Sequence, residues 1–279
     1  MTSAKPLLAA AALSLLAATA AYSSDLPPII NAPEVTIGGT SIAQGWYIRG
    51  DLGYSGWVRG GKPTYTDYAV NGGDPVATTF DGGRFSEPFS YGVGMGYQFN
   101  DVFRADLTTE FFNGSFDGRS NLGAPCTTSQ AAGTTCGVTH NADYNAISVL
   151  ANGYVDIANI AGFTPYVGAG VGMTNIQWGG SHTYRCKNGA GACDGTTYLP
   201  ENWPGEESWR FTYALMAGAS YDLTNRVKLD LGYRFTDMNG GKMFGYTTAE
   251  QANGATGTKA FDDGFQRHEF RAGIRINTW

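Results

Sequence analysis

The sequence predicts an all-β protein, an eight-stranded antiparallel up-and-down transmembrane β-barrel with short turns at one end and four long loops at the other. Three observations predict this fold. Apolar and polar residues alternate in eight segments, the connections between the segments are alternately short and long, and charged residues occupy the parity opposite the apolar side chains. A period of two is typical of strands, in which successive side chains point to opposite faces.

The composition favours the same fold class. Of the 279 residues 40 are glycine, 13% are aromatic and only 15% are charged, yet the mean hydropathy is slightly negative at −0.21. This mixture arises when alternating strands are joined by long hydrophilic connections. The net charge of −6 argues against nucleic acid as a partner, because an acidic chain has no electrostatic attraction for phosphate.

The N-terminal region has the features of an export signal. Lys5 supplies a positive start, an apolar stretch follows, and Ala18 and Ala20 form an A-x-A cleavage pattern. We expect residues 1–20 to be a signal peptide, since the apolar run is too short for a membrane anchor and lacks a positive stop-transfer flank. Residues 21–43 are then a Pro-rich periplasmic lead, and residues 44–279 form the barrel.

Eight segments carry the alternation, and the first shows it clearly. Trp46, Ile48, Leu52, Tyr54 and Val58 share one parity, whereas Arg49 and Asp51 lie on the other. The segments are residues 45–58, 89–99, 103–111, 145–157, 165–173, 209–223, 227–235 and 268–279. Each has about nine residues or more, enough for a tilted strand to cross a bilayer. A sheet that spans lipid must close on itself, because no backbone group can stay unpaired there.

The connections add evidence that no single strand provides. Short links at 100–101, 158–163 and 224–225 alternate with long polar connections at about 59–84, 113–143, 177–208 and 239–264. In a soluble β-sandwich protein, no physical constraint makes short and long connections alternate in this way. Barrels of the outer membrane do, with short periplasmic turns and long external loops.

Charged residues on the second parity predict a packed interior. The candidates for an ion network are Arg49, Asp51, Arg104, Asp106, Glu110, Asp156, Arg210, Lys228, Asp230, Arg234, Arg267, Glu269, Arg271 and Arg275, with Asp222 on the same parity. Unpaired charge in a confined interior is costly, so a nearly balanced set favours mutual pairing over a wide channel. Glycines within 92–96 and 168–172 share this parity, and we expect them to make room for the long side chains.

Four cysteines fall in two close pairs within polar connections. Cys126 precedes Cys136 by ten residues, and Cys186 precedes Cys193 by seven. In an exported protein such pairs predict local disulfides. Zinc is the alternative, but His182 is the nearest histidine and no C-x-x-C motif accompanies it, so we expect no metal site.

Several strands are also similar to those of a known group. The segments "GWYIRGDLGYS", "TPYVGAGVGM", "ASYDLTNRVKLDLGYRF" and "HEFRAGIRINTW" resemble the OmpA-like, opacity-type outer-membrane β-barrel proteins of Gram-negative bacteria, particularly alphaproteobacteria. The resemblance covers the strands from about Gly45 onward and not the loops. It implies an eight-stranded barrel whose C-terminal aromatic residue, here Trp279, is read by the barrel-assembly machinery. Trp279 departs from the pattern, since it breaks the parity of Ile274 and Ile276. Either a bulge near Asn277 restores the phase, or Trp279 lies beyond the ladder at the membrane interface.

No segment predicts catalysis or a cofactor. His140 and His182 lie in long connections, and His268 falls on the lipid-facing parity without a serine and carboxylate arrangement. We therefore expect a non-enzymatic protein of the outer membrane with a structural and surface-interaction role. A narrow passive channel for small solutes is the alternative. The expected partners are outer-membrane lipid and lipopolysaccharide, the assembly machinery, and a surface ligand of the external loops.

Overall fold

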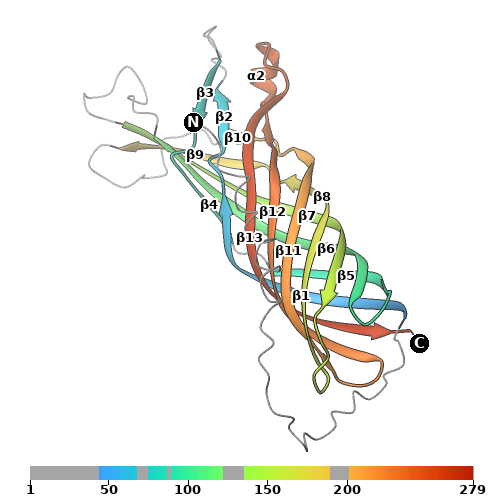
Figure 1. The fold of residues 1–279 in the computed structure, drawn as a ribbon. Helices are drawn as coiled ribbons and strands as arrows, with labels where there is room; N and C mark the ends of the chain where they lie inside the picture. Colours follow the sequence, from blue (N-terminus) through green and yellow to red (C-terminus); the bar gives the residue numbers. More distant parts are fainter. Residues whose placement is uncertain (1–43, 68–74, 87–88, 122–134, 189–200, 279) are drawn as a thin grey trace, which may run out of the picture. The chain divides into compact units, whose positions relative to one another are not determined.

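The computed structural model describes residues 44–67, 75–86, 89–121, 135–188 and 201–278. Residues 1–20, expected to be the signal peptide, and residues 21–43, expected to be the lead, lie outside the described residues. Eight long strands form the body of the sheet (Figure 1). They are β1 (Gly45–Gly60), β5 (Phe89–Gln98), β6 (Phe103–Asn121), β7 (Thr135–Asp156), β8 (Phe163–Trp178), β11 (Glu207–Asp222), β12 (Val227–Gly245) and β13 (Thr258–Asn277).

These eight strands close into a ring. Each pairs antiparallel with its two neighbours in the order β1, β5, β6, β7, β8, β11, β12, β13, and β13 returns to β1. The closing ladder runs from Tyr47 opposite Asn277 to Gly60 opposite Phe265. The predicted all-β barrel, with its eight strands and up-and-down order, is confirmed.

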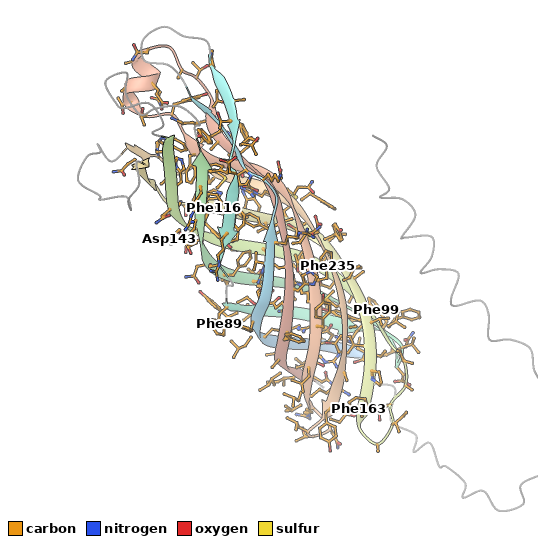
Figure 2. The ribbon with its side chains drawn as sticks, turned by 90° about the vertical axis from the view of Figure 1, so that its left-hand side faces the viewer. Phe89, Phe99, Phe116, Asp143, Phe163 and Phe235 are labelled. Atoms are coloured by element: carbon orange, nitrogen blue, oxygen red, sulfur yellow. The ribbon has the colours of Figure 1, made fainter. Side chains whose placement is uncertain are left out.

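The apolar parity lies on the outside of the ring, as the alternation predicts. Leu52, Tyr91 and Phe270 are each exposed by 60% or more of their surface, while Arg49 and Asp51 are buried. Figure 2 labels Phe89, Phe163 and Phe235 of these strands and Phe99 directly after β5, and all but Phe235 are among the strongly exposed residues. A soluble barrel would have the opposite arrangement, with its apolar side chains inside.

One outward residue was predicted wrongly. Val58 does not continue the outer parity of Tyr54 but packs partly buried against the aromatic cluster of the interior. The cause is a register shift between Ser55 and Trp57, where β1 carries an extra residue relative to β13. A β-bulge of this kind reverses the facing of every residue that follows it.

The connections at one end of the ring are tight turns, and we call this the short-turn end. Asn100 receives hydrogen bonds from the backbone N–H groups of Val102 and Phe103. Between β7 and β8, Ala161 and Gly162 both have positive φ angles, 53° and 87°, and Ile160 and Phe163 exchange backbone hydrogen bonds around them. Two positive φ angles in succession are typical of a type I′ turn.

At the other end, the long-loop end, much of what the sequence predicts as loop is ordered strand. β6, β7, β12 and β13 extend well past their predicted limits. The additional elements are β2 (Thr64–Asp67), β3 (Val76–Thr79), β4 (Gly82–Phe85), β9 (Ser181–Asn188), β10 (Glu201–Trp203) and the short helix α2 (Thr248–Ala252). Figure 1 shows β2, β3, β9, β10 and α2 beyond this end of the ring. Within the described residues, no helix is long and apolar enough to cross a membrane.

The C-terminal strand keeps its phase to the end of the described ladder. Asn277 pairs with Tyr47 and is buried, and Thr278 donates a backbone hydrogen bond to Trp46. Up to Thr278, the last residue that the structure describes, no bulge near Asn277 restores the phase of the final aromatic. Trp279 itself lies outside the described residues, so its role in assembly stays a prediction.

Candidate functional site

The interior of the ring is held together by ion pairs, and Glu110 on β6 is at the centre of them. Its carboxylate lies 2.6 Å from Arg234 Nη1, 3.1 Å from Arg267 Nη1 and 3.4 Å from Arg271 Nη1. These arginines come from β12 and β13, so Glu110 joins opposite walls of the barrel. Only 1% of the surface of Glu110 is exposed. A buried carboxylate of this kind needs several donors to offset the loss of water.

A second group of charges lies toward the short-turn end. Arg49 contacts Asp51 at 2.7 Å and Asp106 at 2.9 Å, and it also donates a hydrogen bond to the Tyr154 hydroxyl. Asn152 donates to the other oxygen of Asp106 at 2.7 Å. Arg49 and Asp106 therefore each have both a charged and a neutral partner, and Asp51 is paired with Arg49 and Arg271, which favours a stable buried network.

A third group closes the interior at the short-turn end. Arg104 pairs with Asp156 at 3.1 Å and lies over the rings of Tyr154 and Tyr166, 4.0 and 4.7 Å from their centroids. Contacts of this kind are favourable because the face of an aromatic ring carries negative charge. Beside it, Arg275 lies 3.5 Å from Asp230.

The structure brings together twelve of the predicted network residues in the interior of the barrel. Arg49, Arg104, Arg234, Arg267, Arg271 and Arg275 face Asp51, Asp106, Glu110, Asp156, Asp230 and Glu269, six bases and six acids. The remaining two lie apart. Lys228 pairs at 2.5 Å with Asp222 at the half-exposed rim, and Arg210 pairs at 2.6 Å with Asp262 toward the long-loop end.

The glycines of β5 and β8 make room for these side chains, as expected. A Cβ on Gly94 would lie 3.1 Å from Arg49 Cγ, and one on Gly170 would lie 2.1 Å from Asn152 Oδ1. Sequence reasoning missed the tyrosines on the inner face, Tyr47, Tyr154 and Tyr166. They share the inward parity of Arg49 and Arg104, and this parity was the signal that could have found them.

Little space remains in the interior. A cavity of about 20 Å³ lies among Arg49, Asp51, Tyr154, Asp230 and Arg271. This volume holds about one water molecule. The described interior at this level is therefore packed with side chains.

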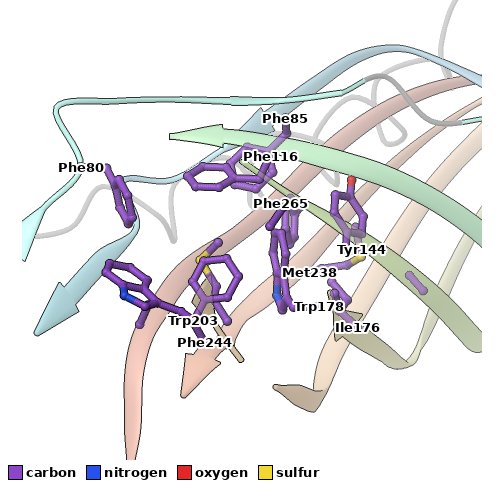
Figure 3. Close-up of a cluster of buried hydrophobic side chains, with 14 of the residues drawn as sticks. Phe80, Phe85, Phe116, Tyr144, Ile176, Trp178, Trp203, Met238, Phe244 and Phe265 are labelled. Atoms are coloured by element: carbon purple, nitrogen blue, oxygen red, sulfur yellow. The ribbon is translucent and has the colours of Figure 1, made fainter. Parts of the chain in front are cut away.

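Above the ion network, toward the long-loop end, an aromatic cluster fills the ring (Figure 3). Its buried members include Phe80, Phe85, Phe116, Tyr144, Ile176, Trp178, Trp203, Met238, Phe244 and Phe265. The rings meet at distances such as 4.5 Å between Phe85 and Phe265, mostly tilted or edge to face, the arrangements that aromatic pairs prefer. His140, predicted as a loop residue, is buried among them, 4.4 Å from Trp203.

A buried lysine fixes the last long connection to this cluster. The Lys259 ammonium lies 2.5 Å from Glu250 Oε1 and 4.1 Å from the centre of the Trp203 ring. Glu250 also accepts a hydrogen bond from the backbone N–H of Thr247, which caps α2. The connection between β12 and β13 is thus tied to the barrel by charge as well as by apolar contacts.

Asp262 lies on β13 well beyond its lipid-facing stretch, near the aromatic cluster. Burial raises the pKa of its carboxyl to about 6, while Arg210 and the backbone N–H of Gly264 act in the opposite direction. Arg210 also donates to the Lys242 carbonyl and lies 5.6 Å from the centre of the Phe265 ring. The ion pair of Arg210 and Asp262 links β11 to β13 where the lipid-facing part of the barrel ends and the long-loop end begins.

On the outer wall of this end, β4, β6 and β7 surround a hollow of about 520 Å³. It is lined by Gly82, Gly83, Arg84, Asp117, Arg119 and Asn141. Arg84 lies opposite Asp117 in the ladder of β4 and β6. Exposed guanidinium, carboxylate and amide groups so close together can make directional contacts with a polar partner.

The predicted disulfides are not described by the structure. Cys126 and Cys193 lie outside the described residues, and only the backbone of Cys136 and Cys186 is placed. In the ladder of β7 and β9, Cys136 lies opposite Lys187 and Cys186 lies opposite Gly137. The two cysteines are therefore not a directly opposed pair, and the local pairing stays a prediction.

Comparison with known proteins agrees with this architecture. Residues 8–273 match the family model of the outer membrane protein beta-barrel domain. The chain is 39% identical over 245 residues to an uncharacterised protein of Brucella suis, covering 83% of this chain and 84% of that protein. It is 29% identical over 187 residues to a putative adhesin of Rickettsia felis, covering 66% and 72%. Among solved structures, neisserial surface protein A matches with a TM-score of 0.43 and 15% identity, covering 83% of this chain and 96% of that one.

The family match covers nearly the whole chain, and the closed ring with its apolar exterior has the architecture that such a protein needs. The chain belongs to the outer membrane protein β-barrel domain family and is a protein of the outer membrane.

Proposed function

We propose that this protein is a structural barrel with a closed interior whose ordered long-loop end makes contacts at the cell surface. The packed interior is the observation that carries the proposal. Six bases and six acids fill the ring, and the cavity among them holds about one water molecule. The aromatic cluster lies above them. Passage of a hydrated ion would require both layers to rearrange.

The surface role is supported by the order of the long-loop end. Long connections of this kind are usually functional or disordered, and here several of them pack on a buried core. The Rickettsia felis relative is named a putative adhesin. We propose that the hollow around Arg84 and Arg119 contributes to contacts with a surface ligand, and that disulfides Cys126–Cys136 and Cys186–Cys193 brace the neighbouring connections.

We propose no enzymatic activity. His268 contacts Tyr233 and Phe235 on the outer face, next to Phe270, an arrangement that suits a position at the membrane boundary. The other partners are those of its location: membrane lipid and lipopolysaccharide around the barrel, and the barrel-assembly machinery, with Trp279 as its signal.

Planar-bilayer recording tests the closed interior. The purified, folded barrel is expected to give no reproducible single-channel steps in 1 M salt, a concentration on the order used to remove electrostatic barriers. The matched control is Val93→Ala, which changes a lipid-facing side chain and leaves the interior intact. Reproducible steps from the wild-type barrel would overturn the proposal in favour of a narrow channel.

Adhesion of whole bacteria tests the surface role. A non-adherent strain that displays the wild-type barrel is expected to bind fixed mammalian cells, and the double variant Arg84→Ala/Arg119→Ala is expected to bind fewer. Lys228→Ala at the short-turn rim serves as the control, because it removes a positive charge far from the hollow. Equal binding by all three barrels and by the empty strain would contradict a role in adhesion.

A further inference from the structure

Gly232 lines the small interior cavity and faces a second glycine in the neighbouring strand. Gly218 on β11 is opposite Gly232 on β12, so neither strand contributes a side chain at this level. The Tyr166 hydroxyl reaches toward them from β8. A Cβ on Gly218 or Gly232 would lie 2.7 or 2.8 Å from it. The Tyr166 hydroxyl therefore occupies the space that a side chain at either glycine would take, and it presents a polar group to this side of the cavity.

Three buried polar atoms without a protein hydrogen-bond partner belong to residues that line this cavity. They are Asp230 Oδ2, Arg234 Nε and Arg271 Nε. Asp230 and Arg234 flank Gly232 on β12 at intervals of two residues, and Arg271 lies opposite Gly232 on β13. All three side chains therefore start on the inner face around the same glycine. A buried polar atom without a partner costs about 1–3 kcal/mol, so such a cluster is not expected to stay unsatisfied.

We propose that this cavity is a binding site for one structural water molecule, held by Asp230, Arg234 and Arg271. One water molecule can satisfy all three atoms, because it can accept hydrogen bonds from the two N–H groups and donate one to the carboxylate. Its remaining hydrogen can reach the Tyr166 hydroxyl. The cavity of about 20 Å³ fits one molecule, since a single water requires roughly 10–15 Å³ of this kind of volume.

The charges around the cavity exclude an ion. A chloride would meet the carboxylate of Asp230, and a cation would meet the guanidinium groups of Arg234 and Arg271. The other carboxylate oxygen of Asp230 is already engaged by Ser220 and lies 3.5 Å from Arg275. A neutral molecule with both donor and acceptor capacity is the remaining class, and only water is small enough.

The proposal rests on the closed interior of the proposed function, because a water-filled channel would need no defined site. The two can fail separately. Single-channel steps from a barrel that still holds the ordered water would refute the closed interior alone. Silent recordings from a barrel without the water would refute the site alone.

A high-resolution crystal structure of the wild-type barrel tests the site, with a second crystal soaked in bromide. We expect one spherical density peak at about 2.7–3.2 Å from Asp230 Oδ2, Arg234 Nε and Arg271 Nε, without anomalous signal from bromide. An empty cavity in a map that shows other buried waters would overturn the proposal. So would an anomalous peak, which would identify the site as one for anions.

Gly232→Ala provides the second test, because a Cβ there would lie 2.8 Å from the Tyr166 hydroxyl and would displace this partner of the water. We expect this variant to lose the peak and to show one long-lived water fewer in oxygen-17 relaxation dispersion of the folded barrel. Gly153→Ala is the matched control, since no atom lies within 4 Å of a Cβ at this outward glycine. An unchanged peak in Gly232→Ala would overturn the proposal. If that variant does not fold, the wild-type maps still decide.

Discussion

Replacement of Glu110 by glutamine should destabilise the barrel more than any other isosteric change in its interior. Glu110 is the shared partner of Arg234, Arg267 and Arg271 at 2.6, 3.1 and 3.4 Å. Glutamine keeps the shape but removes the charge, so the interior changes from six bases and six acids to six bases and five acids. Removal of one partner of a buried ion pair costs about 3–5 kcal/mol, because the other charge stays buried.

The free energy of unfolding can be measured for both proteins by urea titration in phospholipid vesicles, with tryptophan fluorescence as the signal. Asp222→Asn is the matched control. It breaks the ion pair with Lys228, in which the Asp222 side chain is 30% exposed. Exposed pairs contribute about 0–1 kcal/mol, so the control should lose no more than that. A loss below about 1 kcal/mol for Glu110→Gln would mean that water screens the network, and it would refute the packed interior.

Three further predictions concern the outer face, a turn and the long-loop end. Val93→Arg, on the outward parity between Tyr91 and Tyr97, should lower the free energy of unfolding by about 2–4 kcal/mol, since it places a charge near the middle of the bilayer; a cost as small as that of Val93→Ala would contradict a lipid-facing position. Ala161→Gly should raise the same free energy by about 0.5–1 kcal/mol, because Ala161 has a φ of 53° that disfavours a side chain; no gain would argue against this turn conformation. The carboxyl carbon of Asp262 should titrate in NMR spectra with a midpoint near pH 6. Because burial raises this pKa above its value in the unfolded chain, its contribution to stability should be largest below pH 4 and be lost as the pH rises to about 6; a midpoint below 4 would contradict its desolvation.

The strands and the interior could be predicted because one physical rule governs both. Lipid requires an apolar outer face, and a period of two then assigns every alternate residue to the interior. Arg49, Glu110 and Arg271 were assigned to the interior from parity alone, and they lie there, Arg271 in ion pairs with Asp51 and Glu110. Their partners could not be predicted, because pairing across the ring depends on the stagger between strands far apart in sequence.

The differences from the predictions have local causes. Val58 points inward because one extra residue in β1 shifts the alternation of inward and outward side chains. No residue type predicts such a bulge reliably. The long connections were predicted as loops because their polar residues conceal the alternation. His140 and Trp203 show that strands continue there, around a core that only the tertiary structure assembles. Arg210 shares the parity of the network but lies too near the long-loop end to reach it.

The closed interior can be tested most directly by osmotic swelling of liposomes, because this assay detects small neutral solutes that single-channel recording misses. Vesicles that contain the folded wild-type barrel should swell in glycine or urea at the rate of protein-free vesicles. Glu110→Gln removes a charge without removing volume. Vesicles that contain this variant should therefore swell at the rate of protein-free vesicles as long as the variant stays folded. Rapid swelling of wild-type vesicles, graded by solute size, would contradict the closed interior and establish a narrow channel.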